Sequence, residues 1–93
     1  MVIQSYCKAF RENTLKLTLR EVSEISGTDL KTISAFENLR SSNIMHLQVY
    51  LKSCSTDAQR SEFATGIGNI LYQQSREMGY EAELNRINKK YGK

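Results

Sequence analysis

One face of a predicted helix over residues 30–37 carries the side chains best suited to recognition chemistry. The outward residues of this helix are Lys31, Thr32, Ser34 and Ala35. They are small or polar, whereas Ile33 and Phe36 fall on the other side. A lysine donates to O6 and N7 of guanine, and a small apolar group fits against the methyl of thymine. The face therefore has the chemistry expected of a surface that reads base edges in the major groove of DNA.

The sequence offers no comparable arrangement for catalysis. His46 is the single histidine, and no Ser/His/Asp or Cys/His/Asn set with a recognisable spacing accompanies it. The two cysteines, Cys7 and Cys54, match no metal-binding spacing and are expected to be reduced packing residues. Gly66 and Gly68 are not followed by the Lys-Ser/Thr pair of a phosphate-binding loop. We expect a protein that is not an enzyme and that uses no cofactor or metal.

The helix that precedes the polar face is expected to start at a capping box. The Thr18 hydroxyl can accept a hydrogen bond from the third backbone N–H, while the Glu21 carboxylate accepts one from the Thr18 N–H. A helix begun there places Val22 and Ile25 on one apolar face. Ser23 follows Val22, and its small side chain suits a close crossing of two helices.

A tight turn is expected to join the two helices. Gly27 can adopt a positive φ without steric cost, so it can end the first helix and reverse the chain. Thr28 or Asp29 can then cap the second helix. Ile33, Phe36 and Leu30 supply its apolar residues.

The stretch from Thr18 to Asn38 resembles the helix-turn-helix of the lambdoid repressor and Cro proteins, also called the XRE-like family. The family pattern runs roughly L-T-x-x-x-L-A-x-x-S-G-[VT]-S-x-x-x-I-S-x-[IFW]-E-N-G. The matching residues are Leu17, Thr18, Val22, Ser23, Ser26, Gly27, Thr28, Asp29, Ile33, Ser34, Phe36, Glu37 and Asn38. The resemblance covers about Tyr6 to Cys54, somewhat over half of the chain. It implies an all-α protein, a compact five- to six-helix bundle of the lambda-repressor-like type with a C-terminal helical extension.

The resemblance also implies a structural ion pair. Phe10-Arg11-Glu12 resembles the L-R-E run that ends the family's first helix, and in that family the arginine pairs with the glutamate of E-N-G. Arg11 and Glu37 are therefore expected to pair. The chain departs from the pattern at Leu39, where the family has glycine. Either Asn38 adopts the left-handed conformation or the helix runs on.

By position in the family motif, the second helix enters the major groove with its N-terminal end, while the first helix and the following loop contact phosphates. The implied DNA-binding residues are Thr18, Arg20, Asp29, Leu30, Lys31, Thr32, Ser34, Ala35, Asn38, Arg40, Ser41, Ser42 and Asn43. For Ser42 and Asn43, capping of the next helix is an equal alternative. Small proteins of this family are typically repressors from phages or mobile elements. Others bind a protein partner instead, as anti-repressors, modulators of repression or antitoxins.

Length, composition and charge limit the kinds of fold and function that the chain can have. Ninety-three residues with 40 % hydrophobic and 25 % charged residues make one ordinary globular unit, which leaves little room for a large active-site cleft. The formal charge of +3 and the pI of about 9.0 favour a polyanionic partner only weakly. No apolar run approaches the roughly 20 residues of a membrane span, and no signal-peptide core is apparent. We expect a cytoplasmic protein, in a bacterial cell or a phage-infected host, with no membrane partner.

Amphipathic helices flank the motif. A first helix is predicted over Met1–Asn13, followed by a connector over Thr14–Leu17. The apolar face of the first helix comprises Ile3, Tyr6, Cys7 and Phe10. After a polar loop over Leu39–Asn43, a helix is predicted over Ile44–Cys54. Its core-facing stripe comprises Ile44, Leu47, Leu51 and Cys54.

A second capping box, Thr56 with Gln59, predicts a helix from Asp57. Its apolar stripe comprises Phe63, Ile67, Ile70, Leu71 and Met78. Gly66 and Gly68 are expected either to let another helix approach closely or to mark a bend. Gly79 is a predicted stop, and a last helix follows. That helix spans Tyr80–Tyr91 with a stripe of Tyr80, Leu84, Ile87 and Tyr91.

The break at residues 53–56 is expected to divide the chain into a DNA-binding domain, residues 1–56, and a helical extension, residues 57–93. One motif reads only about half a turn of duplex, so a homodimer on a two-fold site is expected. The extension would then supply the dimer interface. The interface residues would be Phe63, Ile67, Ile70, Leu71, Leu84 and Ile87. The alternative is that the extension folds back and completes the monomer's own core.

Overall fold

The computed structural model describes residues 2–77, and within this range every regular element is helical. The α-helices are α1 (Ile3–Ala9), α2 (Leu19–Ser26), α3 (Leu30–Glu37), α4 (Leu47–Ser53) and α5 (Asp57–Glu77). One π-helical turn, η1 (Phe10–Leu15), continues α1, and one 3-10 turn, η2 (Ile44–His46), precedes α4. The all-α prediction is confirmed. The predicted stop at Gly79 and the predicted helix over residues 80–91 lie outside the described residues.

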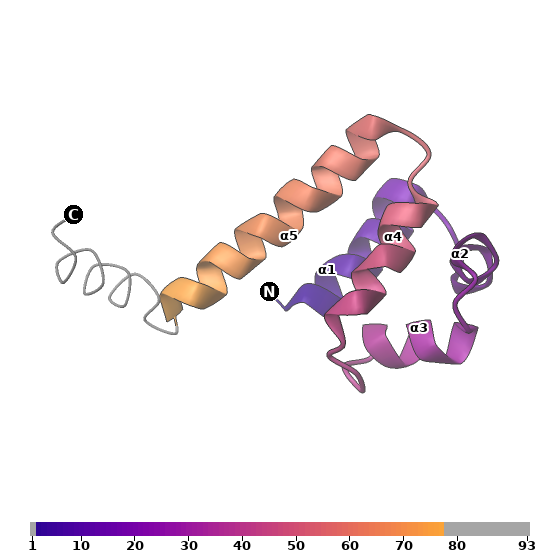
Figure 1. Ribbon diagram of the computed structural model, residues 1–93, viewed down its shortest axis with the longest axis horizontal. Coiled ribbons are helices and arrows are strands. Elements are labelled where there is room, and N and C mark those ends of the chain that lie inside the picture. Colours follow the sequence, from indigo (N-terminus) through magenta and orange to yellow (C-terminus); the bar gives the residue numbers. More distant parts are fainter. Residues whose placement is uncertain (1, 78–93) are drawn as a thin grey trace, which may run out of the picture.

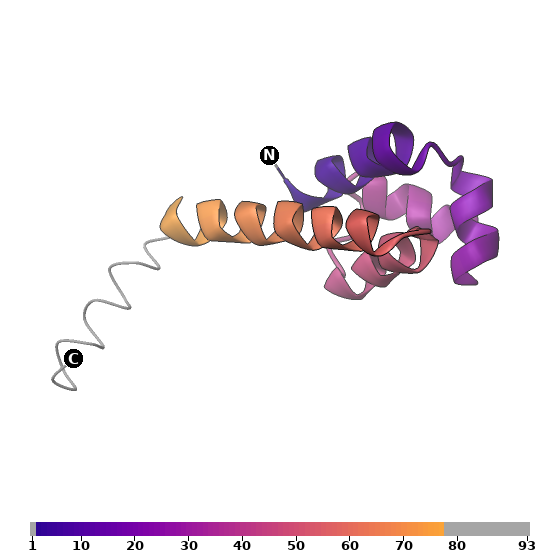
Figure 2. The same cartoon turned by 90° about the horizontal axis from the view of Figure 1, so that it is seen from above.

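The first four α-helices form one group, and α5 lies against it. Helix α4 contacts α2 and α5, while α1 contacts α3 and α5. Figures 1 and 2 show α5 running past α1 and α4, with its C-terminal half extending beyond the rest of the group. The α2–α3 pair therefore lies at the end of the molecule away from the C-terminal end of α5.

A single apolar core joins all five α-helices, η1 and Cys54 in the connection between α4 and α5. The buried residues of the core are Cys7, Phe10, Val22, Ile33, Phe36, Val49, Tyr50, Cys54, Phe63 and Ile67. The ring of Tyr50 lies between two other aromatic rings, with centroids 6.3 Å from Phe36 and 5.8 Å from Phe63. Because Phe63 belongs to α5, the first half of α5 completes the core that α1 to α4 begin.

The first helix differs from the prediction at its C-terminal end. Helical backbone continues through Leu15, as a π-helical turn, so the connector before α2 is shorter than the predicted Thr14–Leu17. The turn ends at Lys16, whose φ of 55° is left-handed. The backbone N–H groups of Lys16 and Leu17 both donate to the carbonyl of Arg11. These two hydrogen bonds end the π-helical turn and position the connector that leads into α2.

The capping signals at α2 and α3 are confirmed. The Glu21 N–H donates to Thr18 Oγ1 at 3.1 Å, and the Thr18 N–H donates to Glu21 Oε1 at 2.9 Å. Gly27 ends α2 with a φ of 74°. The shared apolar face of Val22 and Ile25 was wrong, because Ile25 is 52 % exposed. A step of three residues turns a helix by 300°, which leaves Ile25 about 60° away from Val22 and facing solvent.

The predicted helix over Ile44–Cys54 was wrong at its first turn and at two of its four core-facing residues, whereas Cys54 is buried in the core and Leu47 packs partly buried against it, as predicted. Its first turn is the 3-10 turn η2, which advances about 120° per residue instead of 100°, so the apolar spacing that began at Ile44 does not continue. Ile44 is 56 % exposed and Leu51 38 % exposed. The buried residues within α4 are Val49, Tyr50 and Ser53, none of which belonged to the predicted stripe.

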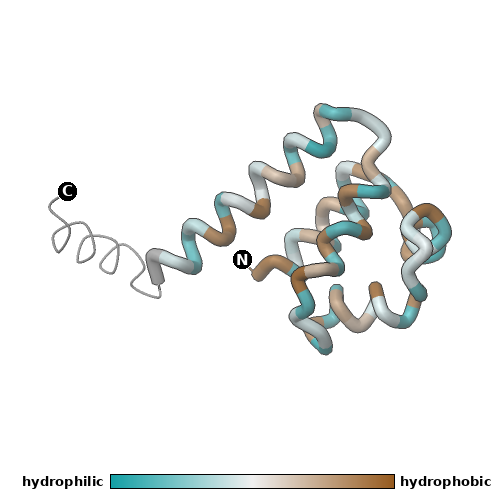
Figure 3. Tube along the Cα trace, in the orientation of Figure 1, coloured by the Kyte–Doolittle hydropathy of each residue, from teal (hydrophilic) through white to brown (hydrophobic). Residues whose placement is uncertain are grey.

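Helix α5 begins at Asp57 as predicted, although its capping box is incomplete. The Gln59 N–H donates to Thr56 Oγ1 at 3.1 Å, but the Gln59 side chain accepts from the Ser55 N–H instead of the Thr56 N–H. Apolar and polar residues alternate along α5 (Figure 3), as expected for a helix with one buried side.

The predicted dimer interface is corrected in three positions. Phe63, Ile67 and Ile70 are 1 %, 8 % and 8 % exposed within a single chain. Side chains already buried in their own monomer are not available to a partner. For these three residues, the alternative that the extension packs on its own monomer therefore applies. Leu71 is 42 % exposed, while Leu84 and Ile87 lie outside the described residues.

Gly66 serves the close approach of another helix. A Cβ added there would collide with the hydroxyl and ring of Tyr6 from α1, whereas one added at Gly68 would meet open space. The Tyr6 hydroxyl donates to the Glu62 carbonyl at 3.3 Å, which fixes α1 beside this turn of α5. Of the two predicted roles, close approach therefore applies at Gly66.

Candidate nucleic-acid interface

The N-terminal end of α3 is exposed and capped by Asp29. Asp29 Oδ2 accepts a hydrogen bond from the Lys31 backbone N–H at 3.0 Å. A carboxylate at this end also interacts favourably with the helix dipole. Capping of α3 therefore gives Asp29 a structural role at this end of the helix, and the side chains of Leu30 and Lys31 are exposed beside it.

Hydroxyl groups of α2 hold the turn between α2 and α3. Ser23 Oγ donates to the Thr28 carbonyl at 2.6 Å, and Ser26 Oγ donates to the Val22 carbonyl at 2.6 Å. Ser26 Oγ also accepts from the Thr28 N–H at 3.3 Å. The sequence suggested that Ser23 matters because its side chain is small. The structure shows that it also forms a hydrogen bond across the turn. These bonds fix the angle at which α3 leaves α2.

A buried polar network anchors the other end of α3. Arg11 Nε and Nη2 donate to the two carboxylate oxygens of Glu37, each at 2.9 Å. The Tyr50 hydroxyl donates to Glu37 Oε2 at 2.8 Å, and Arg11 Nη1 donates to the Leu17 carbonyl at 2.9 Å. The ion pair implied by the resemblance is present, and it joins η1, α3, α4 and the connector before α2.

The network is fully satisfied, which is what makes it tolerable in an apolar core. Arg11 and Glu37 are 7 % and 6 % exposed, and among the described residues no buried side-chain nitrogen or oxygen lacks a partner. The hydrogen bond to Glu37 raises the pKa of Arg11. Burial, followed by the neighbouring Glu37 carboxylate, raises the pKa of Tyr50 and keeps its hydroxyl protonated as a donor.

Tyr50 is the member of this network that the sequence did not reveal. Its position falls outside the stripe that began at Ile44, so it was not assigned to the core. A tyrosine beside Val49 in a helix of a small protein is nonetheless a signal for a buried ring with a hydroxyl that needs an acceptor.

The C-terminal end of α3 corrects both alternatives offered for Asn38 and Leu39. Asn38 has a φ of −96°, and Leu39 itself takes the left-handed conformation with a φ of 64°. The Arg40 N–H donates to the Ala35 carbonyl at 2.8 Å, and the Leu39 N–H donates to the Phe36 carbonyl at 3.2 Å. This pair of bonds is a Schellman motif, whose left-handed position normally holds glycine.

Two of the expected DNA-contact residues are engaged with each other. The side-chain amide of Asn38 donates to the Ser34 carbonyl at 2.9 Å and to Ser34 Oγ at 3.2 Å. The Ser34 hydroxyl proton remains available for an external acceptor, because Oγ acts here only as an acceptor. Thr32, Ser34 and Ala35 are partly exposed.

The loop after α3 is held by its own caps. Asn43 Oδ1 accepts from the Met45 N–H at 3.0 Å, so Asn43 caps the 3-10 turn η2, one of its two expected roles. Gln4 Nε2 donates to the Ser41 carbonyl at 3.0 Å, and Ser41 Oγ accepts from the Asn43 N–H at 3.4 Å. Ser42 is exposed.

Three expected phosphate- or base-contacting cations are exposed. Arg20 lies on α2, Lys31 on α3 and Arg40 after α3. Within the part of the chain that the structure describes, their side chains form no hydrogen bond or ion pair. Their charge is therefore not neutralised by a carboxylate of residues 2–77. Thr18, by contrast, is engaged as the cap of α2.

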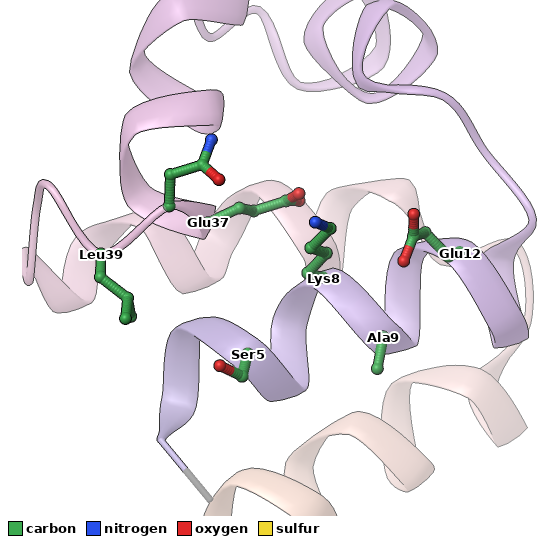
Figure 4. Close-up of a pocket in the computed structure, with 7 residues that line it drawn as sticks. Ser5, Lys8, Ala9, Glu12, Glu37 and Leu39 are labelled. Carbon is green, nitrogen blue, oxygen red and sulfur yellow. The ribbon is translucent and has the colours of Figure 1, made fainter.

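A shallow hollow of about 340 Å³ lies on another part of the surface, between α1 and the C-terminal end of α3. Lys8 of α1 and Glu12 of η1 line it on the side that faces Glu37 (Figure 4). Leu39 forms part of its rim. The hollow mixes opposite charges and lies at the far end of α3 from Lys31, so it does not belong to the capped N-terminal surface.

Comparisons with known proteins identified no similar protein. No protein-family model, curated protein or solved structure matches the chain. None of the helices within residues 2–77 combines the length and the apolar character that a bilayer crossing requires.

Proposed function

We propose that this protein is a sequence-specific DNA-binding regulator of transcription that inserts the N-terminal end of α3 into the major groove. The observation that carries the proposal is the pairing of an exposed, polar α3 surface with a buried clamp behind it. Lys31 is exposed beside the Asp29 cap, while Glu37 at the far end of α3 is held by Arg11 and Tyr50.

The clamp supports the proposal because base readout needs a rigid reading element. A bidentate contact from one side chain to one base distinguishes bases by about 1–3 kcal/mol only if the helix is held in a fixed position. In this account Lys31 donates to a guanine, and Leu30 and Ala35 contact thymine methyls. Arg20, Arg40 and the N-terminal amides of α2 contact phosphates.

Two copies would occupy the two halves of a two-fold operator, because one reading helix covers about half a turn of duplex. Repression by occlusion of a promoter is the simplest output, as expected for a small phage or mobile-element regulator of the lambdoid type. The resemblance over Tyr6–Cys54, with its Arg11–Glu37 pair, supports this proposal.

The test is selection from a random duplex library with the full chain, carried out at 50 mM and 200 mM salt. The proposal predicts enrichment of a palindrome and an affinity that falls steeply with salt, because phosphate contacts release counterions. Weak, salt-sensitive binding without any enriched sequence would exclude sequence-specific recognition.

A protein-interaction module is the second candidate, and the exposed apolar residues around α3 favour it. Leu39, Ile44 and Met45 are 60 %, 56 % and 59 % exposed, and Leu30 is exposed on α3 itself. Apolar groups in this density suit a protein partner better than phosphates. On this alternative, Lys31→Ala leaves function unchanged and Met45→Asp abolishes it, the reverse of what DNA readout through Lys31 predicts.

A further inference from the structure

An apolar groove of about 280 Å³ lies between α4 and α5, away from the α3 surface. Its lining residues include Leu47, Leu51, Ala64, Ile67, Gly68 and Leu71. Leu51 and Leu71 are 38 % and 42 % exposed, so the groove presents apolar side chains to its opening. Leu51 is exposed in the groove, whereas Leu47 both lines the groove and packs against the core.

Two of the residues that line the groove are small and exposed. Ala64 and Gly68 are one turn apart on α5, and a Cβ added at Gly68 would meet no atom within 4 Å. Small residues at this spacing let a second helix approach closely, while the flanking leucines supply apolar area to bury.

The chain itself contains a segment with the matching pattern. Sixteen residues, 78–93, follow α5 in the sequence, and the stripe Tyr80, Leu84, Ile87 and Tyr91 repeats at helical spacing within them. A helix of about 12 residues is marginal in water unless its apolar face packs against something.

The apolar residues before Met78 and those after Gly79 lie at nearly equal sequence distances from this pair. Leu71 lies seven residues before Met78, and Ile87 lies eight residues after Gly79. Ile67 lies eleven residues before, and Tyr91 twelve residues after. Two antiparallel helices joined by a two-residue loop bring residues at equal distances from the loop side by side, since both rise about 1.5 Å per residue.

We propose that the groove between α4 and α5 is the docking site of residues 80–91 of the same chain. Ile87 packs on Leu71 on the Leu47 side of the groove, and Tyr91 covers the small residues at Gly68 and Ala64, nearer Leu51. The same chain is the occupant because a two-residue connection holds the segment at millimolar effective concentration, well above that of a second copy.

The test is a pair of cysteines in the full chain, Leu71→Cys with Ile87→Cys, under mild oxidation. The control pair is Asn69→Cys with Ile87→Cys, because Asn69 is exposed and lies on the opposite side of α5 from Leu71. The native Cys7 and Cys54 are buried, so the introduced thiols are the reactive ones. The proposal predicts at least a tenfold faster disulfide in the test pair, formed within one chain.

Two results would overturn the proposal. A disulfide that links two chains would assign the groove to a second copy, and equal rates for the two pairs would show that the segment does not dock there. A second variant covers the case in which Leu71→Cys fails to fold. Ile87→Asp is expected to lower the folding equilibrium constant at least tenfold, whereas Asn85→Asp, on the opposite side of the stripe, changes it less than twofold. Equal effects of these two substitutions would also refute docking.

Discussion

The left-handed leucine after α3 allows a quantitative prediction. A residue with a Cβ in this conformation costs about 1–2 kcal/mol, whereas glycine carries no such cost. Leu39 is 60 % exposed, so its side chain contributes only about 1 kcal/mol of burial. Leu39→Ala loses that burial and keeps the strain. Leu39→Gly loses the burial and relieves the strain. The glycine variant should therefore be more stable than the alanine variant by about 1 kcal/mol, and close to the parent chain or slightly more stable.

Urea or thermal unfolding of the three chains measures this difference. For a domain of this size, 1 kcal/mol corresponds to about 4–8 °C in Tm. The comparison is sharp because glycine is normally less stabilising than alanine, so strain at Leu39 reverses the usual order. If Leu39→Ala proves as stable as Leu39→Gly, the residue does not adopt a positive φ in solution and the reasoning fails.

Three further variants or conditions test the packing and the buried network. Tyr50→Phe should lower the free energy of unfolding by about 1.5–3 kcal/mol in urea, because it removes the hydroxyl that donates to the buried carboxylate of Glu37; unchanged stability would contradict the network. Gly66→Ala should destabilise the protein by about 1–2 kcal/mol, because the collision with Tyr6 outweighs the gain in helix propensity of about 1 kcal/mol; a more stable variant would show that the contact is loose. Burial raises the pKa of Cys7 from 9.0 to about 12, so its contribution to stability is complete below pH 9 and is lost as the pH rises toward 12. This thiol should contribute up to about 1.4 kcal/mol per pH unit to the slope, and Cys7→Ala should remove that part while Tyr50, whose pKa burial also raises, retains its own; an unchanged slope would assign the alkaline loss to other groups.

Local signals in the sequence predicted the elements around the candidate site. The Thr18–Glu21 box, Gly27 and the Asp57 start each depend on contacts within four residues, so a single segment contains all of the information that specifies them. The cap of α3 was narrowed by the same kind of local signal to Thr28 or Asp29, and the structure shows that Asp29 is the cap.

Features that depend on contacts between distant segments were not predictable in the same way. The burial of Tyr50 requires the positions of Phe36 and Phe63, and the exposure of Ile44 follows from a 3-10 turn whose three-residue period the helical pattern does not anticipate. Phe63 and Ile67 had an apolar stripe that fitted either a dimer interface or a monomer core. Only the arrangement of α5 on α1 and α4 decides between those two outcomes.

The left-handed Leu39 is a third kind of case. The sequence showed that the glycine usual at this position of the family motif is absent. The two expected consequences, a left-handed Asn38 or a longer helix, were both wrong. The hydrogen bonds of Arg40 and Leu39 to Ala35 and Phe36 offset the strain, and contacts of the following loop with Gln4 and within residues 41–45 hold the chain on the far side of Leu39.

The most direct test of the central claim is the affinity of two lysine variants for the enriched duplex and for an unrelated duplex. Lys31 lies at the N-terminal end of α3, whereas the exposed Lys52 lies on α4 and serves as a matched loss of one positive charge. The account predicts that Lys31→Ala weakens binding to the enriched duplex by about 1–3 kcal/mol and removes the preference over the unrelated duplex, while Lys52→Ala does neither. Equal, small losses for both variants on both duplexes would contradict base readout by α3.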